Sequence, residues 1–345
     1  MPRHWLIFYR HVRTIFVLPE NQAPGPSHAM TKPALAQHPD APDHSRTQAP
    51  DQTVAGTRPA RDTHPDKPRN TRKTRKTLTR QARGLSWYWR LFATGFAFCS
   101  FGLGGLLMAL TIFPAMMVVL QNRARRRKYA QFVICRGFRL FTWMLDITGV
   151  AGVEAHNVDR LRTARGALII ANHPTLLDVV MILSRMDRCQ CVVKHELFRN
   201  PFLFGVVRAA GFIRNDDNPE NLIVQARHHL AAGANIMIFP EGTRTPPKCK
   251  LGKLQRGAAN IAIETQADLI PVVVHCNHDT LKKGVPWYRI PPSKIQFRLE
   301  VDPPILFNDI HDPGLPRAKQ SRALTRFIKE YILSRLKHDF AGNRT

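Results

Sequence analysis

Acidic residues and cysteines are both scarce in this 345-residue chain. Asp and Glu total 25 against 51 Lys and Arg, which leaves a formal net charge of +26. Such an excess requires a negatively charged partner, whether nucleic acid, acidic lipid headgroups or a phosphorylated substrate. The 6 cysteines form no Cys-x-x-Cys pair, which argues against a disulfide scaffold and a structural zinc site. Reduced thiols in a cytosolic compartment are therefore expected.

Large apolar residues are scarce between about residues 19 and 82, where Pro, Thr, Asp, Arg and Gln dominate. This segment ends in a basic run over residues 67–76. It cannot bury enough apolar surface to offset the entropy of ordering the chain. We therefore predict that residues 1–86 form a disordered basic arm, and we assign no function to it.

Charge of either sign is missing between Leu91 and Asn122. This apolar run is long enough to cross a bilayer, which needs about 20 residues. Its glycines and Pro114 are tolerated in membrane helices. Five positive charges follow over residues 123–128. This flank places the rest of the chain on the cytoplasmic side of a membrane, which is the inner membrane in a bacterium.

Two other arrangements of the apolar region remain open at this point. A re-entrant or in-plane helix pair could run over residues 91–120 and 129–147. A buried helix of a soluble core is the third interpretation. In each of the first two cases residues 87–147 form a membrane-associated helical segment, and we divide the chain accordingly.

From about residue 148 to the end, short apolar runs alternate with stretches of helical periodicity. Such alternation predicts an α/β fold with a mixed, mostly parallel sheet flanked by helices. Strands are expected over residues 167–171, 191–193, 235–239, 270–274 and 294–301. Helices are expected over residues 174–186, 219–232, 256–265 and 318–339.

The first candidate for chemistry is the segment Asn172-His-Pro-Thr-Leu-Leu-Asp178, between a predicted strand and a predicted helix. Ligands of α/β sheets gather at the carboxyl ends of strands, so His173 is well placed for a site. Asp178, about one and a half turns into the helix, would reach back to the imidazole. A carboxylate on one ring nitrogen fixes the tautomer and leaves the other nitrogen to take a proton. A local cap or ion pair is the alternative interpretation of the same residues.

The second candidate is Phe239-Pro-Glu-Gly-Thr-Arg244, which follows another apolar run. Pro240 and Gly242 predict a turn, and Gly242 would let a ligand approach the backbone. Arg244 supplies a forked cation that suits phosphate. Glu241 could position that Arg or accept a hydroxyl, and a plain turn with a local Glu–Arg pair is the alternative.

Together these two motifs resemble those of the glycerolipid acyltransferase family, which includes 1-acylglycerol-3-phosphate and other lysophospholipid acyltransferases. Further blocks fit in the same order: Gly211-Phe-Ile213, Leu254-Gln-Arg-Gly-Ala258 and Leu269-Ile-Pro-Val272. The resemblance covers about residues 145–305. It implies an acyltransferase domain over residues 148–345 with a fold of the glycerol-3-phosphate acyltransferase type.

The resemblance implies direct attack of an acceptor hydroxyl on a thioester. His173 would take the proton from that hydroxyl, and Asp178 would orient the imidazole. The chain has no Gly-x-Ser-x-Gly elbow, so a covalent acyl-enzyme is not expected. The acyl donor would be acyl-CoA or acyl-acyl-carrier-protein, with no metal or other cofactor.

By the same resemblance, Glu241, Gly242, Thr243 and Arg244 would bind the glycerol and phosphate of the acceptor. In the family, the Gly-x-Ile block usually runs on through apolar residues to an Arg that helps to hold phosphate. Here the positive charge comes early, at Arg214, and two acids follow. Arg214 is the candidate substitute, and this departure bears on the identity of the lysolipid more than on the reaction.

Other polar clusters receive structural interpretations. Lys194-His195-Glu196 is expected at a surface or a helix start, and His228-His229 on the solvated face of a helix. The segment His275–Asp279 offers an incomplete set of zinc ligands in a turn-like context. The final helix is expected to pack its apolar stripe on the domain rather than on lipid.

The combined prediction is a membrane-bound O-acyltransferase that acts most simply on 1-acyl-sn-glycerol-3-phosphate and gives phosphatidic acid. Its partners would be the lysophospholipid, the acyl donor and membrane lipids. An alternative is the same fold acting on an amino-lipid or a secondary-metabolite acyl chain. A nucleic-acid-binding protein is a weaker alternative, because the basic arm has almost no aromatics to stack on bases. A non-catalytic membrane scaffold conflicts with the intact His/Asp motif.

Overall fold

The computed structural model describes residues 85–215 and 218–337. The disordered arm predicted over residues 1–86 lies outside these, apart from residues 85 and 86, which begin a helix.

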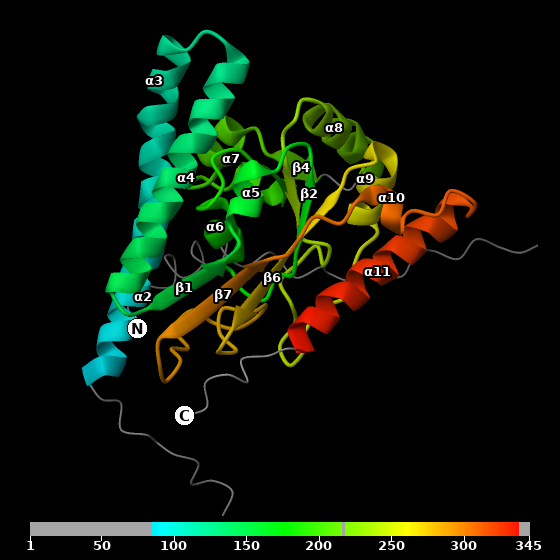
Figure 1. Ribbon diagram of the computed structural model, residues 1–345. Coiled ribbons are helices and arrows are strands. Elements are labelled where there is room, and N and C mark those ends of the chain that lie inside the picture. The colour runs from blue at the N-terminus through cyan, green and yellow to red at the C-terminus, as the bar shows by residue number, and fades with distance from the viewer. Residues whose placement is uncertain (1–84, 216–217, 338–345) are drawn as a thin grey trace, which may run out of the picture. The chain divides into compact units, whose positions relative to one another are not determined.

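A seven-stranded sheet organises the domain, in the order β1-β7-β6-β2-β5-β3-β4 (Figure 1). Only β6 and β7 pair antiparallel, and every other neighbouring pair is parallel. The predicted mixed, mostly parallel sheet is therefore confirmed. The strands are β1 (Ala151–His156), β2 (Leu168–Ala171), β3 (Gln190–Lys194), β4 (Ile213–Asn215), β5 (Ile236–Ile238), β6 (Leu269–Cys276) and β7 (Ile295–Val301).

The central strands are buried on both faces. All residues of β2 and β5 are buried, as expected of parallel strands covered by helices on each side. Leu168 and Ile170 of β2 enter one hydrophobic cluster, and Ile169 and Ala171 enter the other. This is the alternation that the pleat of a strand imposes. β7 alternates between buried and partly exposed residues, which confirms the half-exposed strand predicted there.

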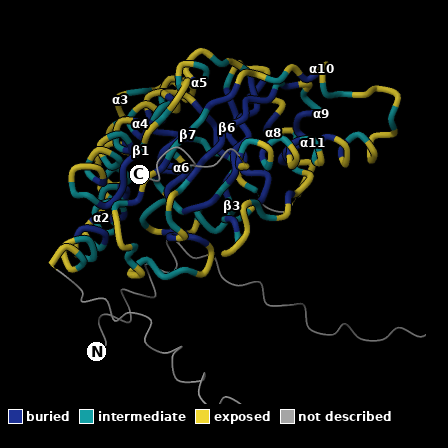
Figure 2. Tube along the Cα trace, turned by 60° about the horizontal axis from the view of Figure 1, so that its bottom comes forward, coloured by how far each residue is buried: buried dark blue, intermediate teal, exposed yellow. Residues whose placement is uncertain are grey.

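Helices cover both faces of the sheet. On one face lie α8 (Pro219–Ala231), α9 (Gly257–Thr265) and α11 (Arg317–Lys337). On the other lie α6 (Asp178–Leu183), α7 (Phe204–Ala210) and a long helical hairpin. Figure 2 shows the strands buried between these layers. The remaining short elements are α5 (Asp159–Thr163), the 3₁₀ helix η1 (His195–Arg199) and α10 (Phe307–Ile310).

Most predicted elements agree with the observed ones at both ends to within about two residues. The helix predicted over 174–186 is wrong at both ends, because α6 runs only from Asp178 to Leu183. The Asp178 carboxylate accepts hydrogen bonds from the Thr175 backbone and hydroxyl, and this turn competes with helix. The sequence interpretation also lacks β1, β4 and α7.

The solvated helix face predicted for the His228-His229 pair is wrong for His229. Only 9% of this residue is exposed, whereas His228 is exposed. Burial lowers the pKa of His229 to about 4, and the nearby Arg127 and His228 add to the shift. This imidazole is therefore neutral at physiological pH.

The apolar region folds as a helical hairpin: α2 (Leu85–Leu110), α3 (Ile112–Val119) and the returning α4 (Arg123–Ile147). α2 ends at Leu110 because Pro114 has no N–H to donate to the Leu110 carbonyl and its ring crowds that group. Asn122 starts α4 by accepting from the Ala124 and Arg125 amides. α4 then runs back alongside α2, where Phe101 packs on two rings of α4 at centroid distances of 6.0 and 5.0 Å.

The outer surface of the hairpin is exposed and apolar. In the described part of the chain, one helical stretch, Leu85–Val119, is long and apolar enough to cross a membrane by length and composition. Only 17% of its most apolar window is buried, which overturns the buried-core interpretation. The exposed large side chains include Trp89, Phe92, Phe96, Leu103, Leu107 and Leu110 on α2, and Tyr129, Phe132, Leu140, Trp143 and Ile147 on α4.

A close backbone contact joins the hairpin to the α/β domain. A Cβ on Gly105 of α2 would lie 2.6 Å from the Phe202 carbonyl oxygen, and one on Gly205 of α7 would lie 2.3 Å from the Ala109 Cβ. Only glycine permits these approaches. Close packing at Gly105 and Gly205, which we call the seat of the hairpin, therefore holds the hairpin against the domain.

Gly105→Ala should loosen this seat, while Gly104→Ala, one residue earlier on the same helix, should not. A Cβ at Gly104 meets nothing within 4 Å, so that variant should be neutral or gain up to about 1 kcal/mol from helix propensity. Gly105→Ala overpacks the seat and should cost about 1–3 kcal/mol. Thermal unfolding in detergent, with limited proteolysis of the hairpin, compares the two, and equal midpoints would show that the seat is not tight.

Candidate active site

The loops that follow three neighbouring strands meet at one edge of the sheet. β6, β2 and β5 lie side by side and run in the same direction, so their carboxyl ends share an edge. The loop after β2 carries His173 and the loop after β5 carries Glu241. The third loop, residues 277–294, leads to β7. This is the edge at which α/β sheets bind ligands.

His173 and Asp178 form a direct hydrogen-bonded pair. The His173 Nδ1 and Asp178 Oδ2 atoms lie 2.9 Å apart. The Phe239 ring backs the imidazole at a centroid distance of 4.2 Å. The Asp178 side chain is fully buried, whereas 15% of the His173 side chain is exposed. With Nδ1 engaged by the carboxylate, Nε2 is the nitrogen available to a substrate.

The Asp178 carboxylate is held by a tight turn. Its Oδ2 accepts from the Thr175 amide at 2.7 Å, and its Oδ1 accepts from the Thr175 hydroxyl at 2.6 Å. Asp178 is therefore the first residue of α6, not a residue one and a half turns inside a helix. These hydrogen bonds hold the carboxylate beside the imidazole, where it accepts from its neighbours.

Glu241 links the two motif loops. Its Oε1 accepts from the His173 amide at 2.8 Å, and its Oε2 accepts from the Gly252 amide at 2.7 Å. The Thr245 hydroxyl lies 2.8 Å from Oε2 and 3.0 Å from Oε1, and only 3% of Glu241 is exposed. The predicted contact of Glu241 with a substrate stays a prediction, but its observed bonds make it the clamp that positions His173.

The turn that carries Gly242, Thr243 and Arg244 lies beside the pair. The Gly242 amide donates to the Phe239 carbonyl at 2.9 Å, and Gly242 adopts a φ of 63°, which favours glycine. The Arg244 Nη1 donates to the Leu281 carbonyl at 2.9 Å. Burial lowers the pKa of Arg244, and the Asp178 charge opposes that shift. Arg244 thus lies close enough to Asp178 to feel its charge, while Thr243 is half-buried between its neighbours.

Arg214 lies further along the same edge. It is exposed on β4, the last strand of the sheet, opposite Val193 of β3. Among the described residues, no hydrogen bond or ion pair joins it to His173 or Arg244. Lys194, given a surface role above, ends β3 at the same carboxyl edge and is half-buried. In the sequence, the place of Lys194 directly after an apolar run was the feature that could have marked it as a residue of this edge.

Asn172 was missed as a positioning residue. Its side chain donates to the Val274 carbonyl and accepts from the Val274 amide, both at 2.8 Å. These two hydrogen bonds to β6 fix the position of the chain where β2 ends and the loop with His173 begins. Thr245 adds a second brace, since its amide donates to the His173 carbonyl at 2.7 Å. Both residues stand inside or next to the motifs, but their partners are distant in the sequence.

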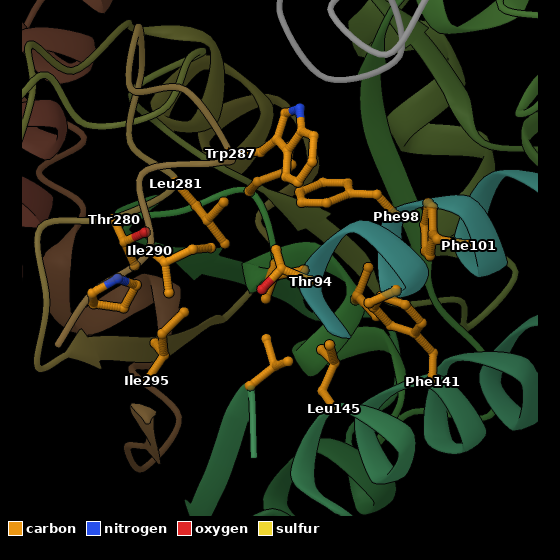
Figure 3. Close-up of a pocket in the computed structure, with 16 residues that line it drawn as sticks. Thr94, Phe98, Phe101, Phe141, Leu145, Thr280, Leu281, Trp287, Ile290 and Ile295 are labelled. Atoms are coloured by element: carbon orange, nitrogen blue, oxygen red, sulfur yellow. The ribbon is translucent and has the colours of Figure 1, made fainter. Parts of the chain in front are cut away.

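An apolar pocket lies beside the site (Figure 3). Leu176 and Leu177, between His173 and Asp178 in the chain, line it, as does Leu281, whose carbonyl accepts from Arg244. Its space, with the open mouth included, is about 580 Å³. The other walls come from Thr94, Ala97, Phe98 and Phe101 of α2, Phe141 and Leu145 of α4, and Val150, Val180, Thr280, Trp287, Ile290, Pro291 and Ile295.

Over residues 85–215 and 218–337, no group of three or more His, Cys, Asp or Glu is arranged to hold a metal ion. Burial raises the pKa of Cys191 and of Cys276 to about 12, so neither thiol is a thiolate nucleophile near neutral pH.

Comparison with known proteins identifies this architecture. The family model described as Acyltransferase matches residues 152–275, which contain His173, Asp178 and the turn at Arg244. Residues 152–275 thus match the acyltransferase family. Within this matched region, the segment from β1 to β6 supplies every residue that the sequence resemblance assigned to the site.

The acyltransferase domain also resembles individual proteins. The chain is 24% identical over 178 residues to the 1-acyl-sn-glycerol-3-phosphate acyltransferase of Pseudomonas aeruginosa, which covers 50% of this chain and 66% of that protein. It is 29% identical over 128 residues to the human 1-acyl-sn-glycerol-3-phosphate acyltransferase beta, which covers 35% and 45%. The chain thus spans less than two thirds of the length of these relatives.

A solved structure shares the fold. The crystal structure of the 1-acyl-sn-glycerophosphate (LPA) acyltransferase from Thermotoga maritima superposes with a TM-score of 0.55 at 19% identity. It covers 74% of this chain and 97% of that protein. The superposition confirms the predicted glycerol-3-phosphate acyltransferase type of fold.

Proposed function

We propose that this chain transfers a fatty acyl group from a thioester to the free hydroxyl of a lysophospholipid, with 1-acyl-sn-glycerol-3-phosphate as the acceptor. The observation that carries this proposal is the His173–Asp178 pair, whose connecting segment lines an apolar pocket. Relatives named for the same acceptor support its identity.

The geometry supports direct acyl transfer. The Nδ1–H of His173 donates to Asp178, so Nε2 can take the proton from the acceptor hydroxyl as its oxygen attacks the thioester carbonyl. The tetrahedral intermediate then expels the thiolate, and the imidazolium returns the proton to that sulfur. The products are the diacyl lipid and a free thiol. The Asp178 carboxylate, hydrogen-bonded to Nδ1, stabilises the imidazolium in between.

Cations along the carboxyl edge would hold the acceptor's phosphate. Arg244 stands next to the catalytic pair, and Gly242 and Thr243 present the turn against which a glycerol backbone could lie. Lys194 and Arg214 extend the positive row along β3 and β4. A guanidinium suits a phosphomonoester because it donates two parallel hydrogen bonds.

An acceptor panel tests this proposal. The chain, purified and reconstituted in vesicles, would receive one acyl-CoA and either lysophosphatidate, monoacylglycerol or lysophosphatidylcholine. We expect lysophosphatidate to be the best acceptor. Arg244→Gln should raise its KM by about 10–100-fold, the usual weight of hydrogen bonds to a charged group, and should change monoacylglycerol acylation far less. Failure to acylate any lysolipid from acyl-CoA, and then from acyl-acyl-carrier-protein, would refute the proposal.

The apolar pocket would hold the acyl chain of the donor. Ala97 of α2 lines it and is 3% exposed. Ala97→Phe should fill part of the pocket, lowering kcat/KM for long-chain thioesters by about tenfold or more while sparing short-chain ones. Leu103→Phe, on the exposed side of the same helix, is the control. A uniform loss across chain lengths would argue against this assignment.

The hairpin would fix the domain to a membrane, with the catalytic domain on the cytoplasmic face. Its exposed apolar side chains suit the acyl region, and Trp89 and Trp143 suit the headgroup boundary. Five cations stand in the first turns of α4, where positive charge is unfavourable to the helix dipole. Anionic headgroups would relieve that repulsion. Since α3 turns back into α4, the in-plane or re-entrant arrangement is favoured over a single crossing.

A further inference from the structure

The segment that follows β5 is strongly cationic. Residues 242–263 contain five Lys or Arg and no Asp or Glu. Arg244 belongs to the site already described. The other four stand on the loop Thr245–Arg256, and all are exposed: Lys248, Lys250, Lys253 and Arg256. The loop thus adds four exposed positive charges to this edge of the sheet, while the Glu241 carboxylate that contacts its backbone is buried.

Hydrogen bonds fold this loop against the catalytic residues. At its start, the Thr245 amide donates to the His173 carbonyl at 2.7 Å. At its middle, the Gly252 amide donates to the Glu241 carboxylate, whose other oxygen accepts from the His173 amide. At its end, the Gln255 amide donates to the Pro240 carbonyl at 2.7 Å. One carboxylate therefore separates the loop backbone next to Lys253 from the backbone of His173.

A thioester bound at His173 has two ends that need separate places. The acyl chain has the apolar pocket, walled by α2, α4 and residues 280–291. The carrier beyond the sulfur cannot enter that pocket if it is charged. The loop Thr245–Arg256 offers the opposite chemistry within the same site. Lys248 and Lys253 are five residues apart, so they span at most about 17 Å even in an extended chain, which suits a small polyanion.

We propose that the loop Thr245–Arg256 binds the phosphates of a nucleotide-linked thiol carrier, so that the acyl donor is acyl-CoA. This deepens the proposed function and rests on it. The exposed lysines attract the diphosphate and the 3′-phosphate of the carrier, while Glu241 holds the loop at a fixed position beside His173. Contacts of this exposed kind are individually weak and salt-sensitive, so their effect is collective.

Three donors with the same acyl chain separate this proposal from its alternatives: acyl-CoA, acyl-3′-dephospho-CoA and acyl-pantetheine. The test variant is the triple substitution Lys248→Ala, Lys250→Ala and Lys253→Ala in the full chain. Its control, Lys319→Ala, Arg322→Ala and Lys329→Ala, removes the same charge from the exposed face of α11. Lysophosphatidate in vesicles is the acceptor throughout.

We expect the wild-type KM to rise from acyl-CoA to its dephospho form and again to acyl-pantetheine. The loop variant should raise the KM for acyl-CoA about tenfold and so close most of that gap, while the α11 variant should keep it. Equal KM values for the three donors in the wild type, or an equal loss on all three in the loop variant, would overturn the proposal. So would transfer from acyl-acyl-carrier-protein alone. Absence of transfer from every donor would instead count against the proposed function.

Discussion

His173→Ala is expected to lower acyl transfer to lysophosphatidate by about 10²–10⁴-fold, the range that general base catalysis contributes. The reason is local: the His173 imidazole is hydrogen-bonded to the buried Asp178 carboxylate and is backed by the Phe239 ring, so it is the group held in position to take the proton. Thiol release from acyl-CoA in the presence of lysophosphatidate measures the loss. Because only 15% of the His173 side chain is exposed, the unfolding midpoint should be recorded for the same preparation.

Two further variants keep this result interpretable. His228→Ala removes an exposed imidazole on α8 and should leave turnover unchanged. Asp178→Asn keeps the shape of the turn, but its amide group cannot accept all the bonds that the carboxylate accepts from Thr175 and His173. It should lower turnover by about 10²-fold or more through the wrong tautomer. Near-wild-type turnover of His173→Ala would remove the mechanism.

Glu241→Gln is expected to damage both stability and turnover, although the residue is not assigned to the chemical step. Its two oxygens accept from the His173 amide, the Gly252 amide and the Thr245 hydroxyl. An amide can turn only one oxygen toward these donors and would point its own N–H₂ at the rest. Leaving one buried donor unsatisfied should cost about 1–3 kcal/mol, and the displaced His173 should lower kcat by about tenfold or more.

Thermal unfolding and initial rates on the same preparation test this variant. Glu330→Gln makes the same chemical change at an exposed position on α11 and should alter neither quantity. If Glu241→Gln raised only the KM for lysophosphatidate and left the unfolding midpoint intact, Glu241 would be an acceptor ligand, as the sequence resemblance implied, and not a clamp.

The sequence predicts the sheet well because its central strands are short, apolar runs bounded by turn residues. β2 and β5 are buried on both faces, so each appears in the sequence as a continuous apolar run that predicts a strand. β4 has only three residues, too few for a periodic pattern. The late start of α6 could not be predicted either, because it depends on which donors reach the Asp178 carboxylate.

The site was predictable in its residue types but not in its connections. His173 and Asp178 are five residues apart, and local geometry sufficed to pair them. Glu241 and His173 are 68 residues apart, and Asn172 and Val274 are 102 apart. Such contacts depend on strand order, which places β6, β2 and β5 side by side. The pocket needs the hairpin as well, whose seat depends on a backbone approach at Gly105.

The central claim is that the His173 imidazole activates the acceptor's hydroxyl for direct attack. The most direct measurement incubates the reconstituted chain with a radiolabelled acyl thioester, first without and then with lysophosphatidate, and follows label on protein and lipid after denaturation. The account predicts no covalently labelled protein at any time, and labelled phosphatidic acid only after the acceptor is added. A labelled protein that passes its acyl group to lysophosphatidate would contradict it.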